Sequence, residues 1–491
     1  MKLTIDNRTE YLNDYHFQTL CLLYYPGEKF PPDIEKHEND AFFSLYEDKG
    51  VFNARVILKC GDRSSTAEFS ASSCDHLINY SNEDVAAYVI GKAYLDAGSK
   101  LFGFLPPWGY LTGLRPVKRA KYYLDRGYSE SRVNELFCEG YSVSVEKSDL
   151  SIETAKNETE YLKGVGEEDC CLYVAIPFCP TRCEYCSFVS YSNAKLFKLI
   201  PDYLTRLFED IEKTANIIKS IGKKLKYIYI GGGTPSFLTN EQIGRLLDRI
   251  NGSFDMSSVR EYTFEAGRPD CITREKLETV RSHGIGRISV NPQTTSDAVL
   301  QRIGRHHTVK QFFDAAELAM SVGFDNINAD LIAGLPSDTD ESFYKSLDDI
   351  IGLGFSNITV HTLSVKNAAP IRFDENDIYD ANGTRVRKNV EESRRILASH
   401  GYYPYYLYRQ KNTVGNGENT GFALNGRGCL YNILMMEEVL TVFACGASSI
   451  TKLVNKDGTR IDRIAFPKYP FEYLETEHDI GEDRIRSFFG I

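Results

Sequence analysis

The sequence predicts an α/β protein built around a partial (β/α)6 barrel, preceded by an N-terminal α+β domain and followed by a C-terminal α/β extension. From about residue 170 onwards, apolar β-branched segments alternate with segments of helical period. Six such units indicate parallel strands with helices on the outside. Polar and sulfur-bearing residues recur where these strands end, which is where parallel α/β folds place their chemistry. The first 165 residues lack this alternation.

The strand and helix candidates can be placed in chain order. We expect strands at 172–176, 227–230, 261–266, 287–290, 326–334 and 357–363. The helix candidates cover about 197–220, a stretch from near Thr239, a stretch from near Thr273, two short stretches after residue 290, and about 340–353. The helix near Thr239 has a clear start, because Thr239 and Gln242 have the spacing of a capping box before an apolar run.

The regions on either side of the barrel have patterns of their own. Residues 42–60 indicate a β-hairpin that turns near Asp48–Gly50, and residues 83–97 indicate an amphipathic helix. After the barrel, a helix near 384–400 is followed by a tyrosine-rich segment at 402–408. The expected division is an N-terminal α+β domain at 1–165, the barrel at 166–375, and a C-terminal region at 376–491 that covers the substrate.

The composition excludes several classes of protein. With 491 residues, 42% hydrophobic and 25% charged, the chain has ample material for a globular core. Its formal net charge of −11 argues against non-specific nucleic-acid binding, which needs a cationic surface. No apolar run is long enough for a membrane span and the first residues are too polar for a signal peptide, so we expect a cytoplasmic protein. Its twelve cysteines are then thiols, metal ligands or catalytic groups, because disulfides are rare in a reducing compartment.

Three cysteines gather in the loop after the first barrel strand. Cys179, Cys183 and Cys186 follow LYVAIPF with three and then two residues between them. A structural zinc site normally has four ligands, and this loop offers three thiolates with no histidine beside them. Thiolates also hold [4Fe–4S] clusters. With three thiolates, one iron keeps an open coordination position, so the loop predicts a catalytic cluster rather than a structural zinc ion.

The motif Cys-x3-Cys-x-Tyr-Cys after a strand resembles that of the radical S-adenosylmethionine superfamily. In that family the open iron binds the amino and carboxylate groups of the methionine moiety. An electron from the cluster then cleaves the sulfonium and gives a 5′-deoxyadenosyl radical. The resemblance therefore implies two cofactors, a [4Fe–4S] cluster with one open iron and S-adenosylmethionine, which the barrel must bind, orient and keep from water.

Candidate ligands of the cofactor stand at the ends of the later strands. The glycines of GGGTPS, at 231–236, let a ligand approach the backbone, although such a run also suits a tight turn. Glu265 can accept a hydrogen bond from an ammonium or ribose group, Gln293 can bond the ribose, and Arg305 can pair with the methionine carboxylate. Asp330 lies in an otherwise apolar strand, where an unpaired acid is costly. Each of these residues alone could equally be salt-bridged or on the surface.

Six blocks together resemble one branch of the superfamily, the oxygen-independent coproporphyrinogen III oxidases or coproporphyrinogen dehydrogenases. They are LYVAIPFC, GGGTPS, TFEA, RISVNPQ, GRHHT and ADLIAGLP, in the order and spacing of that branch, and they cover about 170–365. The resemblance implies contacts with S-adenosylmethionine at Tyr173, Tyr185, Gly232, Gly233, Thr234, Glu265, Gln293, Arg305, Asp330 and Ser364. In this branch Tyr173 would pack beside the cluster and Tyr185 would contact the adenine through its backbone. No catalytic residue is implied beyond the cluster and its cofactor.

The implied activity is an oxidoreductase reaction of porphyrin and haem biosynthesis, the oxidative decarboxylation of coproporphyrinogen III to protoporphyrinogen IX. The implied partners are the tetrapyrrole and an electron donor such as flavodoxin or ferredoxin. Two alternatives remain open: a haem-binding chaperone of the same family, with His306 or His307 as axial ligands, and a radical enzyme acting on another tetrapyrrole. A tetracarboxylate substrate needs arginines, and the candidates are Arg182, Arg268 and Arg409.

Two departures from the branch concern the substrate. The second position after Cys186 is Phe188, where the best-studied form has a fourth cysteine, and relatives without that cysteine include haem-trafficking chaperones. Asn291–Pro292 stands where a glycine and an aliphatic residue are usual. The tyrosines at 402–408 could line a macrocycle site or fill a core. Trp108, with the nearby LTGLRPVKR, could belong to a partner surface or to a core with a solvated basic turn.

Overall fold

Six parallel strands form the centre of the fold. The computed structural model describes residues 1–31, 37–77, 80–186, 191–364, 383–475 and 479–491. The six strands are β5 (Asp169–Ile176), β6 (Lys224–Gly232), β7 (Glu261–Gly267), β8 (Arg287–Val290), β9 (Ile327–Ala333) and β10 (Asn357–Thr362). Each strand pairs in parallel with the next one along the chain. The six predicted strands and their parallel order are therefore confirmed.

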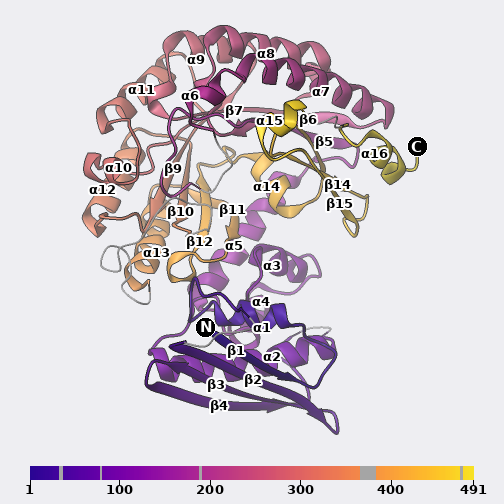
Figure 1. Cartoon of the computed structure of the whole chain (residues 1–491), viewed down its shortest axis with the longest axis vertical. Helices are drawn as coiled ribbons and strands as arrows, with labels where there is room; N and C mark the ends of the chain where they lie inside the picture. The colour runs from indigo at the N-terminus through magenta and orange to yellow at the C-terminus, as the bar shows by residue number, and fades with distance from the viewer. Residues whose placement is uncertain (32–36, 78–79, 187–190, 365–382, 476–478) are drawn as a thin grey trace. The chain divides into compact units, whose positions relative to one another are not determined.

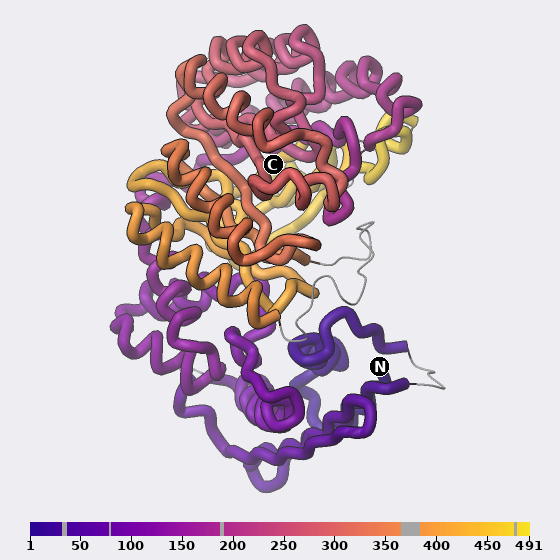
Figure 2. Tube along the Cα trace, turned by 90° about the vertical axis from the view of Figure 1, so that its left-hand side faces the viewer, coloured from indigo at the N-terminus to yellow at the C-terminus, as the bar shows by residue number. Residues whose placement is uncertain are grey.

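Helices cover the outer face of these strands (Figure 1). The longer ones are α7 (Ile200–Ser220), α8 (Asn240–Ser253), α9 (Arg274–Ser282), α11 (Val309–Ser321) and α12 (Asp340–Gly352). Figure 2 shows the coils of these helices along the Cα trace from a second side. In α8 the buried residues are Ile243, Leu246, Leu247 and Ile250, which have the spacing of one helical face. Packing of this apolar face on the sheet leaves the inner face of the strands for other groups.

The other helices are shorter or lie outside the barrel. They are α1 (Asp14–Cys21), α2 (Asn82–Phe102), α3 (Pro116–Leu124), α4 (Glu130–Glu135), α5 (Val145–Leu162), α6 (Ala194–Phe197), α10 (Asp297–Arg302), α13 (Thr384–Ser399), α14 (Leu430–Glu437), α15 (Pro470–Glu475) and α16 (Glu482–Phe489). Of the two stretches expected after residue 290, α10 is short, whereas α11 extends over thirteen residues. The predicted helix near 384–400 is confirmed as α13.

A threonine fixes the start of α8. The N–H of Gln242 donates to Thr239 Oγ1 at 3.2 Å, and the N–H of Thr239 donates to Gln242 Oε1 at 2.9 Å. The predicted capping box is therefore confirmed. Thr308 and Thr339 cap α11 and α12 in the same way. These caps set where the outer helices begin, just after the loops that carry the candidate site.

We expect Thr239→Ala to lower the free energy of unfolding by about 1 kcal/mol, because the first turn of α8 loses a capping oxygen. Urea unfolding followed by circular dichroism measures the change. The matched control is Thr205→Ala, since the exposed Thr205 hydroxyl only bonds back to Pro201 O within α7. An equal effect of the two substitutions would contradict the capping role.

Strands from the C-terminal region extend the sheet at both edges. They are β11 (Tyr403–Arg409), β12 (Glu418–Ala423), β13 (Thr441–Cys445), β14 (Ile450–Val454) and β15 (Ile461–Ala465). The eleven-stranded sheet has the order β11-β12-β10-β9-β8-β7-β6-β5-β13-β14-β15. β12 lies antiparallel to β10, and β13 lies parallel to β5. The first and last barrel strands are thus internal strands of the sheet and not its edges.

Helix α14, from the C-terminal region, packs against the inner face of the strands, opposite the outer helices (Figure 1). Its Tyr431 ring stacks on Tyr229 of β6, with ring centroids 4.6 Å apart. Glu261, the first residue of β7, accepts hydrogen bonds from the N–H groups of Leu430 and Tyr431 at 2.9 Å each. A carboxylate from the barrel therefore satisfies the free donors at the start of α14.

The N-terminal part of the chain forms a separate four-stranded sheet. Its strands are β1 (Lys2–Asn7), β2 (Asn39–Asp48), β3 (Val51–Cys60) and β4 (Arg63–Ala71), in that order across the sheet. The predicted hairpin is confirmed, because β2 and β3 pair antiparallel through Lys49 and Gly50, both with positive φ. Helix α2 packs on β3 and β4. Trp108 is fully buried in the core of this part.

The chain divides into two compact units. The first comprises 1–156, 379–388 and 407–419, and the second comprises 157–378, 389–406 and 420–491. Within the first unit, Glu418 accepts hydrogen bonds from Trp108 Nε1 at 3.0 Å and from Lys147 Nζ at 2.7 Å. The domain boundaries at residues 165 and 375, and the roles expected of the three domains, stay predictions. Among the residues described, no helix combines the length and the apolarity needed to cross a membrane.

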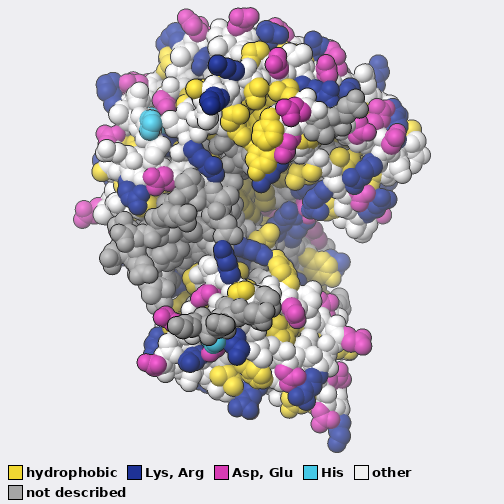
Figure 3. Space-filling view, in the orientation of Figure 1, with side chains coloured by type: hydrophobic (Ala, Val, Ile, Leu, Met, Phe, Trp, Pro, Cys, Tyr) yellow, Lys and Arg dark blue, Asp and Glu magenta, His cyan; other side chains and the backbone are white. Residues whose placement is uncertain are grey.

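Charged side chains of both signs are intermixed over the face drawn in Figure 3. The described helices also carry exposed ion pairs at helical spacing, such as Lys310–Asp314 at 2.7 Å. Apolar side chains gather on the same face over α15, where Tyr469 and Phe471 are exposed and stack on each other. This face therefore has mixed charge, unlike the cationic surfaces that nucleic acids require.

Candidate functional site

The carboxyl ends of β5 to β10 bring the predicted residues to one edge of the sheet. The cysteine loop follows β5, Gly232 ends β6, and Glu265 lies near the end of β7. Gln293 and Ser364 lie just beyond β8 and β10, and Asp330 lies within β9. Because parallel strands end at the same edge, residues separated by almost 200 positions in the sequence become neighbours.

Backbone hydrogen bonds hold the cysteine loop in place. Cys179 and Cys183 are buried and Cys186 is half-buried. The N–H of Cys179 donates to Tyr191 O at 3.0 Å, and the N–H of Cys186 donates to Cys183 O at 3.2 Å. Thr234, in the loop after β6, donates from Oγ1 to Cys179 Sγ at 3.3 Å. No group of three or more His, Cys, Asp or Glu side chains in the described ranges is positioned to hold a single metal ion.

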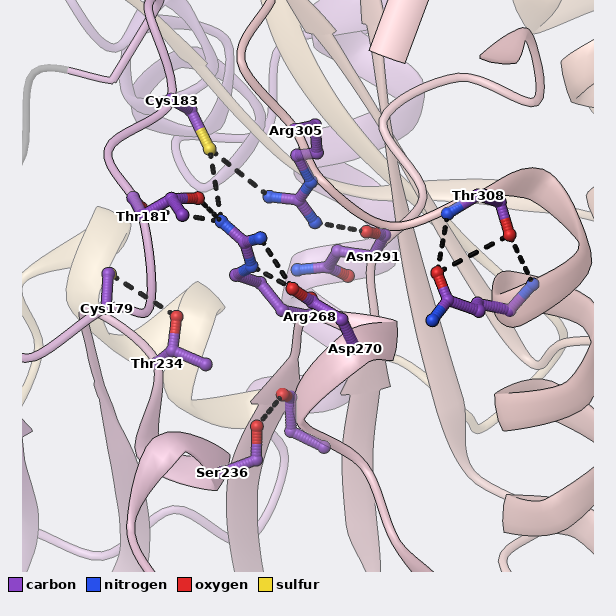
Figure 4. A network of polar contacts seen from close by, with 12 residues as sticks. Cys179, Thr181, Cys183, Thr234, Ser236, Arg268, Asp270, Asn291, Arg305 and Thr308 are labelled. Atoms are coloured by element: carbon purple, nitrogen blue, oxygen red, sulfur yellow. Dashed lines mark hydrogen bonds and ion pairs between the residues drawn. The ribbon is translucent and has the colours of Figure 1, made fainter. Parts of the chain in front are cut away.

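Two buried arginines converge on the sulfur of Cys183 (Figure 4). Arg305 Nη1 lies 3.8 Å from Cys183 Sγ, and Arg268 Nη1 lies 3.9 Å from it. Their exposed fractions are 7% and 3%. Arg305 also donates to Asn291 O and to Tyr185 Oη, the latter at 3.3 Å. Two guanidinium groups therefore face this one sulfur, and they would offset the negative charge of a cluster held there.

The donors and their surroundings fit a [4Fe–4S] cluster with three thiolate ligands. The glycine loop packs directly on the cysteine loop, because a Cβ at Gly233 would lie 2.7 Å from Phe178 O and 3.0 Å from Cys179 Sγ. Gly232, with φ of +116°, has a backbone conformation that side chains disfavour. Burial raises the pKa of the Cys271 thiol to about 11, and it also raises that of Cys171, so these two thiols are poor metal ligands.

Glu265 is held by hydrogen bonds from the neighbouring strand. Its Oε1 accepts from Tyr229 Oη at 2.5 Å, and its Oε2 accepts from the N–H of Gly232 at 3.2 Å. Burial raises the pKa of Glu265 to about 7, opposed by these hydrogen bonds and supported by the nearby charge of Asp330. A carboxyl with this pKa gains strongly from a cationic partner, since a positive charge removes the cost of ionising it.

Asp330 is ionised despite its burial. Burial acts to raise its pKa, but the hydrogen bond and charge of His361 hold the pKa below the usual value. His361 Nε2 lies 3.6 Å from Asp330 Oδ1, and Asn328 Nδ2 donates to the same oxygen at 2.8 Å. Gln293 has a positive φ of 70° and is fixed by backbone hydrogen bonds to Asp330 O and from Ile332 N. A strained, pinned backbone at a strand end is typical of functional sites.

The remaining predicted residues lie at the same edge or beside it. Tyr173 of β5 stacks on Tyr229 and Tyr431, with centroids 6.2 and 6.3 Å apart. Tyr185 lies in the cysteine loop and accepts the hydrogen bond from Arg305. Ser364 is half-buried. Phe188, which marks the missing fourth cysteine, lies outside the described residues.

The three candidate arginines for propionate binding differ in their surroundings. Arg182 is exposed on the cysteine loop. Arg268 is engaged with Asp270 and Cys183. Arg409 belongs to the first compact unit, where it packs over Trp108 and donates to Leu111 O. Of the tyrosines at 402–408, three fill the core rather than line an open site: Tyr402, Tyr405 and Tyr406.

Sequence reasoning missed several groups at the site. Asp270 and Thr181 hold Arg268, and the pattern Arg-x-Asp in GRPD was the available signal. Asn291 was noted only as a departure, yet its Oδ1 also accepts from the N–H of Asp330 at 3.3 Å. His307 was a candidate haem ligand in the sequence; it is buried with neither ring nitrogen hydrogen-bonded among the described residues, and burial together with Arg305 lowers its pKa to about 3. Its neighbour His306 is exposed.

Comparison with protein families gives one match inside the barrel. The model described as "Radical SAM superfamily" matches residues 173–350. The curated "Oxygen-independent coproporphyrinogen-III oxidase-like protein HemZ" of Bacillus subtilis (strain 168) is 36% identical over 400 residues. That alignment covers 81% of this chain and 80% of the relative. The similarity therefore extends beyond the barrel on at least one side.

Other relatives match over shorter or less similar stretches. The "Heme chaperone HemW" of Bacillus subtilis (strain 168) is 37% identical over 195 residues, which is 40% of this chain and 50% of that protein. The HemW of Escherichia coli (strain K12) is 28% identical over 334 residues, 65% of this chain and 80% of that protein. Among solved structures, coproporphyrinogen III oxidase (HemN) from Escherichia coli has a TM-score of 0.48 and 21% identity, with 68% of this chain and 82% of that one covered.

Proposed function

Because the chain belongs to the radical S-adenosylmethionine superfamily, in its oxygen-independent coproporphyrinogen III oxidase-like branch, we propose that it decarboxylates the propionate side chains of coproporphyrinogen III. The observation that carries this proposal is the 36% identity that extends over four fifths of a relative named as oxygen-independent coproporphyrinogen-III oxidase-like. In the net reaction a propionate side chain loses one hydrogen atom, one electron and carbon dioxide, and becomes a vinyl group; the hydrogen atom would pass to the radical that the cofactor supplies and the electron to an external acceptor. Repeated on a second propionate, the reaction gives protoporphyrinogen IX.

The superfamily uses a [4Fe–4S] cluster and S-adenosylmethionine. When bound, these groups supply a carbon-centred radical that takes a hydrogen atom from the substrate. Cys179, Cys183 and Cys186 would hold three irons and leave the fourth for the cofactor. The chain's own task is to bind, orient and exclude water, and the buried loops at the strand ends support that role.

The strand-end residues supply the groups that a methionine and a ribose need. The loop of Gly232, Gly233 and Thr234 offers backbone groups close to the cysteines. Glu265 would accept from the ammonium group, and Arg305 would pair with the carboxylate. The other proposed contacts with the cofactor are Tyr173, Tyr185, Gln293, Asp330 and Ser364.

Glu265→Gln tests the pKa of that carboxyl. The folded pKa of about 7 lies above the ordinary 4.5, so the stability that this group contributes is present below about pH 4.5 and is lost as the pH rises through 7. Glutamine does not titrate. In the absence of cofactor, we expect the variant to exceed the wild type by about 2–3 kcal/mol in free energy of unfolding at pH 8, and by little at pH 5. Urea unfolding at the two pH values measures this, with the exposed Glu275→Gln as control.

The proposed activity is tested by direct turnover. Anaerobically reconstituted protein is mixed with a reductant, S-adenosylmethionine and coproporphyrinogen III. We expect protoporphyrinogen IX and 5′-deoxyadenosine, and neither product from Cys183→Ala. A flavodoxin or a ferredoxin is the proposed electron donor, and either can replace the chemical reductant in the same assay. Absence of porphyrin turnover from protein with an intact cluster would refute the proposal.

A haem chaperone of the same family is the second candidate function. It is supported by the similarity to HemW proteins and by the exposed His306, which could reach an axial position on haem. Stable haem binding without turnover, reduced by His306→Ala, would favour this function. Release of 5′-deoxyadenosine only when haem is added would instead favour a radical enzyme that acts on another tetrapyrrole.

A further inference from the structure

Arg268 occupies an unusual place for a charged side chain. It follows β7 directly and is 3% exposed. Its Nε and Nη2 form a fork on the two oxygens of Asp270, at 3.0 and 2.7 Å. Its Nη1 donates to Thr181 Oγ1 at 2.7 Å and faces Cys183 Sγ at 3.9 Å (Figure 4). Every nitrogen of the guanidinium is therefore committed, and the group cannot swing towards a substrate carboxylate without breaking several bonds.

The charges around Cys183 do not cancel. Arg268 and Arg305 bring two permanent positive charges to within 4 Å of one sulfur. Asp270 is the acid that pairs with Arg268, and although burial acts to raise its pKa, Arg268 keeps that pKa below the usual value. His307, the nearby imidazole, is neutral at physiological pH. An excess positive charge thus remains beside the sulfur in a dry environment, where its field is poorly screened.

We propose that Arg268 is a positioning residue for the cluster, which fixes Cys183 in place and stabilises the reduced cluster electrostatically. One electron taken from an external reductant converts a [4Fe–4S]2+ core to [4Fe–4S]+, with no bond broken and no proton transferred. The added negative charge is favoured by Arg268 and disfavoured by Asp270. The proposal rests on the cluster assigned to the cysteine loop, and it does not depend on which tetrapyrrole is the substrate.

Arg268 and Asp270 carry opposite charges, so substitutions at the two residues should shift the reduction potential of the cluster in opposite directions. Arg268→Gln removes a positive charge, so we expect the ratio of reduced to oxidised cluster at a fixed potential to fall about tenfold, equivalent to about 59 mV for a one-electron couple. Asp270→Asn removes the opposing negative charge and should make the reduction potential of the cluster more positive. Arg268→Lys keeps the charge and should remain closer to the wild type than Arg268→Gln. Each protein is reconstituted, assayed for iron, and titrated with dithionite while the reduced cluster is followed by electron paramagnetic resonance, without porphyrin.

The matched control is Arg302→Gln. Arg302 of α10 pairs with Glu184 of the cysteine loop at 3.0 Å, and it is partly exposed to solvent. Removal of its charge should therefore leave the reduction potential of the cluster nearly unchanged. Loss of iron from both Arg268→Gln and Asp270→Asn, without opposite shifts in the reduction potential of the cluster, would overturn the electrostatic role of Arg268. Equal shifts for Arg268→Gln and Arg302→Gln would overturn it as well. Because the titration needs no substrate, these outcomes are separate from failure of the decarboxylation assay.

Discussion

Replacing Cys183 with alanine is expected to abolish the iron–sulfur absorbance of the anaerobically reconstituted protein. The same loss is expected for Cys179→Ala and Cys186→Ala, because a cluster with an open iron has only three protein ligands and cannot spare one. For Cys183→Ala there is a second cost, since Arg268 and Arg305 would face an empty space without the sulfur that they contact. Iron and sulfide analysis together with visible absorbance measure the loss.

Two other cysteines provide the controls. Cys74 is buried, and burial raises the pKa of its thiol to about 12, so it stays protonated and inert. Cys271 is the stricter control, because it directly follows Asp270 at the edge of the site. We expect both Cys74→Ala and Cys271→Ala to retain a full complement of iron. Loss of the cluster in either control, or its retention in Cys183→Ala, would show that the assigned thiolates are wrong.

Glu261→Ala is expected to destabilise the second compact unit by about 3–5 kcal/mol. Glu261 accepts two backbone hydrogen bonds at the start of α14, and its Oε2 lies 3.7 Å from Nε of Arg287. Arg287 is 4% exposed, so removal of the carboxylate leaves a buried cation without its partner. Burial of an uncompensated charge is the larger part of the expected cost, and the lost cap of α14 adds to it.

A control substitution separates the loss of stability expected for Glu261→Ala from the effect of removing any carboxylate. Glu278 pairs with Arg274 across one turn of α9 at 3.7 Å, and both side chains are more than half exposed. Glu278→Ala should therefore change the free energy of unfolding by less than about 0.5 kcal/mol. Urea unfolding with an intrinsic tyrosine signal compares the two variants. Similar results for both would mean that α14 does not depend on Glu261 for its position.

The sequence was sufficient to predict the six barrel strands because each is marked locally. Their apolar runs are short and bounded by polar loops, and the helices between them begin at recognisable caps such as Thr239. The parallel arrangement then follows from the regular alternation of strand and helix. The same reasoning could not predict β13 beside β5, because nothing in the five residues of β13 specifies a partner so distant in the sequence.

The candidate site was only partly predictable, for a similar reason. Residues placed by the ends of strands, such as Glu265 and the cysteine loop, could be found because strand ends are visible in the sequence. The approach of Arg268 to Cys183 depends on how two loops fold over one another, and this has no local signature. From the sequence Arg268 was one of three candidates for a substrate carboxylate, and in the structure it forms an ion pair with Asp270.

The pairing of β5 with β13 has a consequence for how the chain is made. During synthesis β5 emerges from the ribosome long before β13, so for most of that time one flank of the first barrel strand has no partner. Such distant pairings form slowly, and an open strand flank invites association with other chains. A fragment that ends at residue 375 would lack β13 and would leave this flank of β5 unpaired permanently.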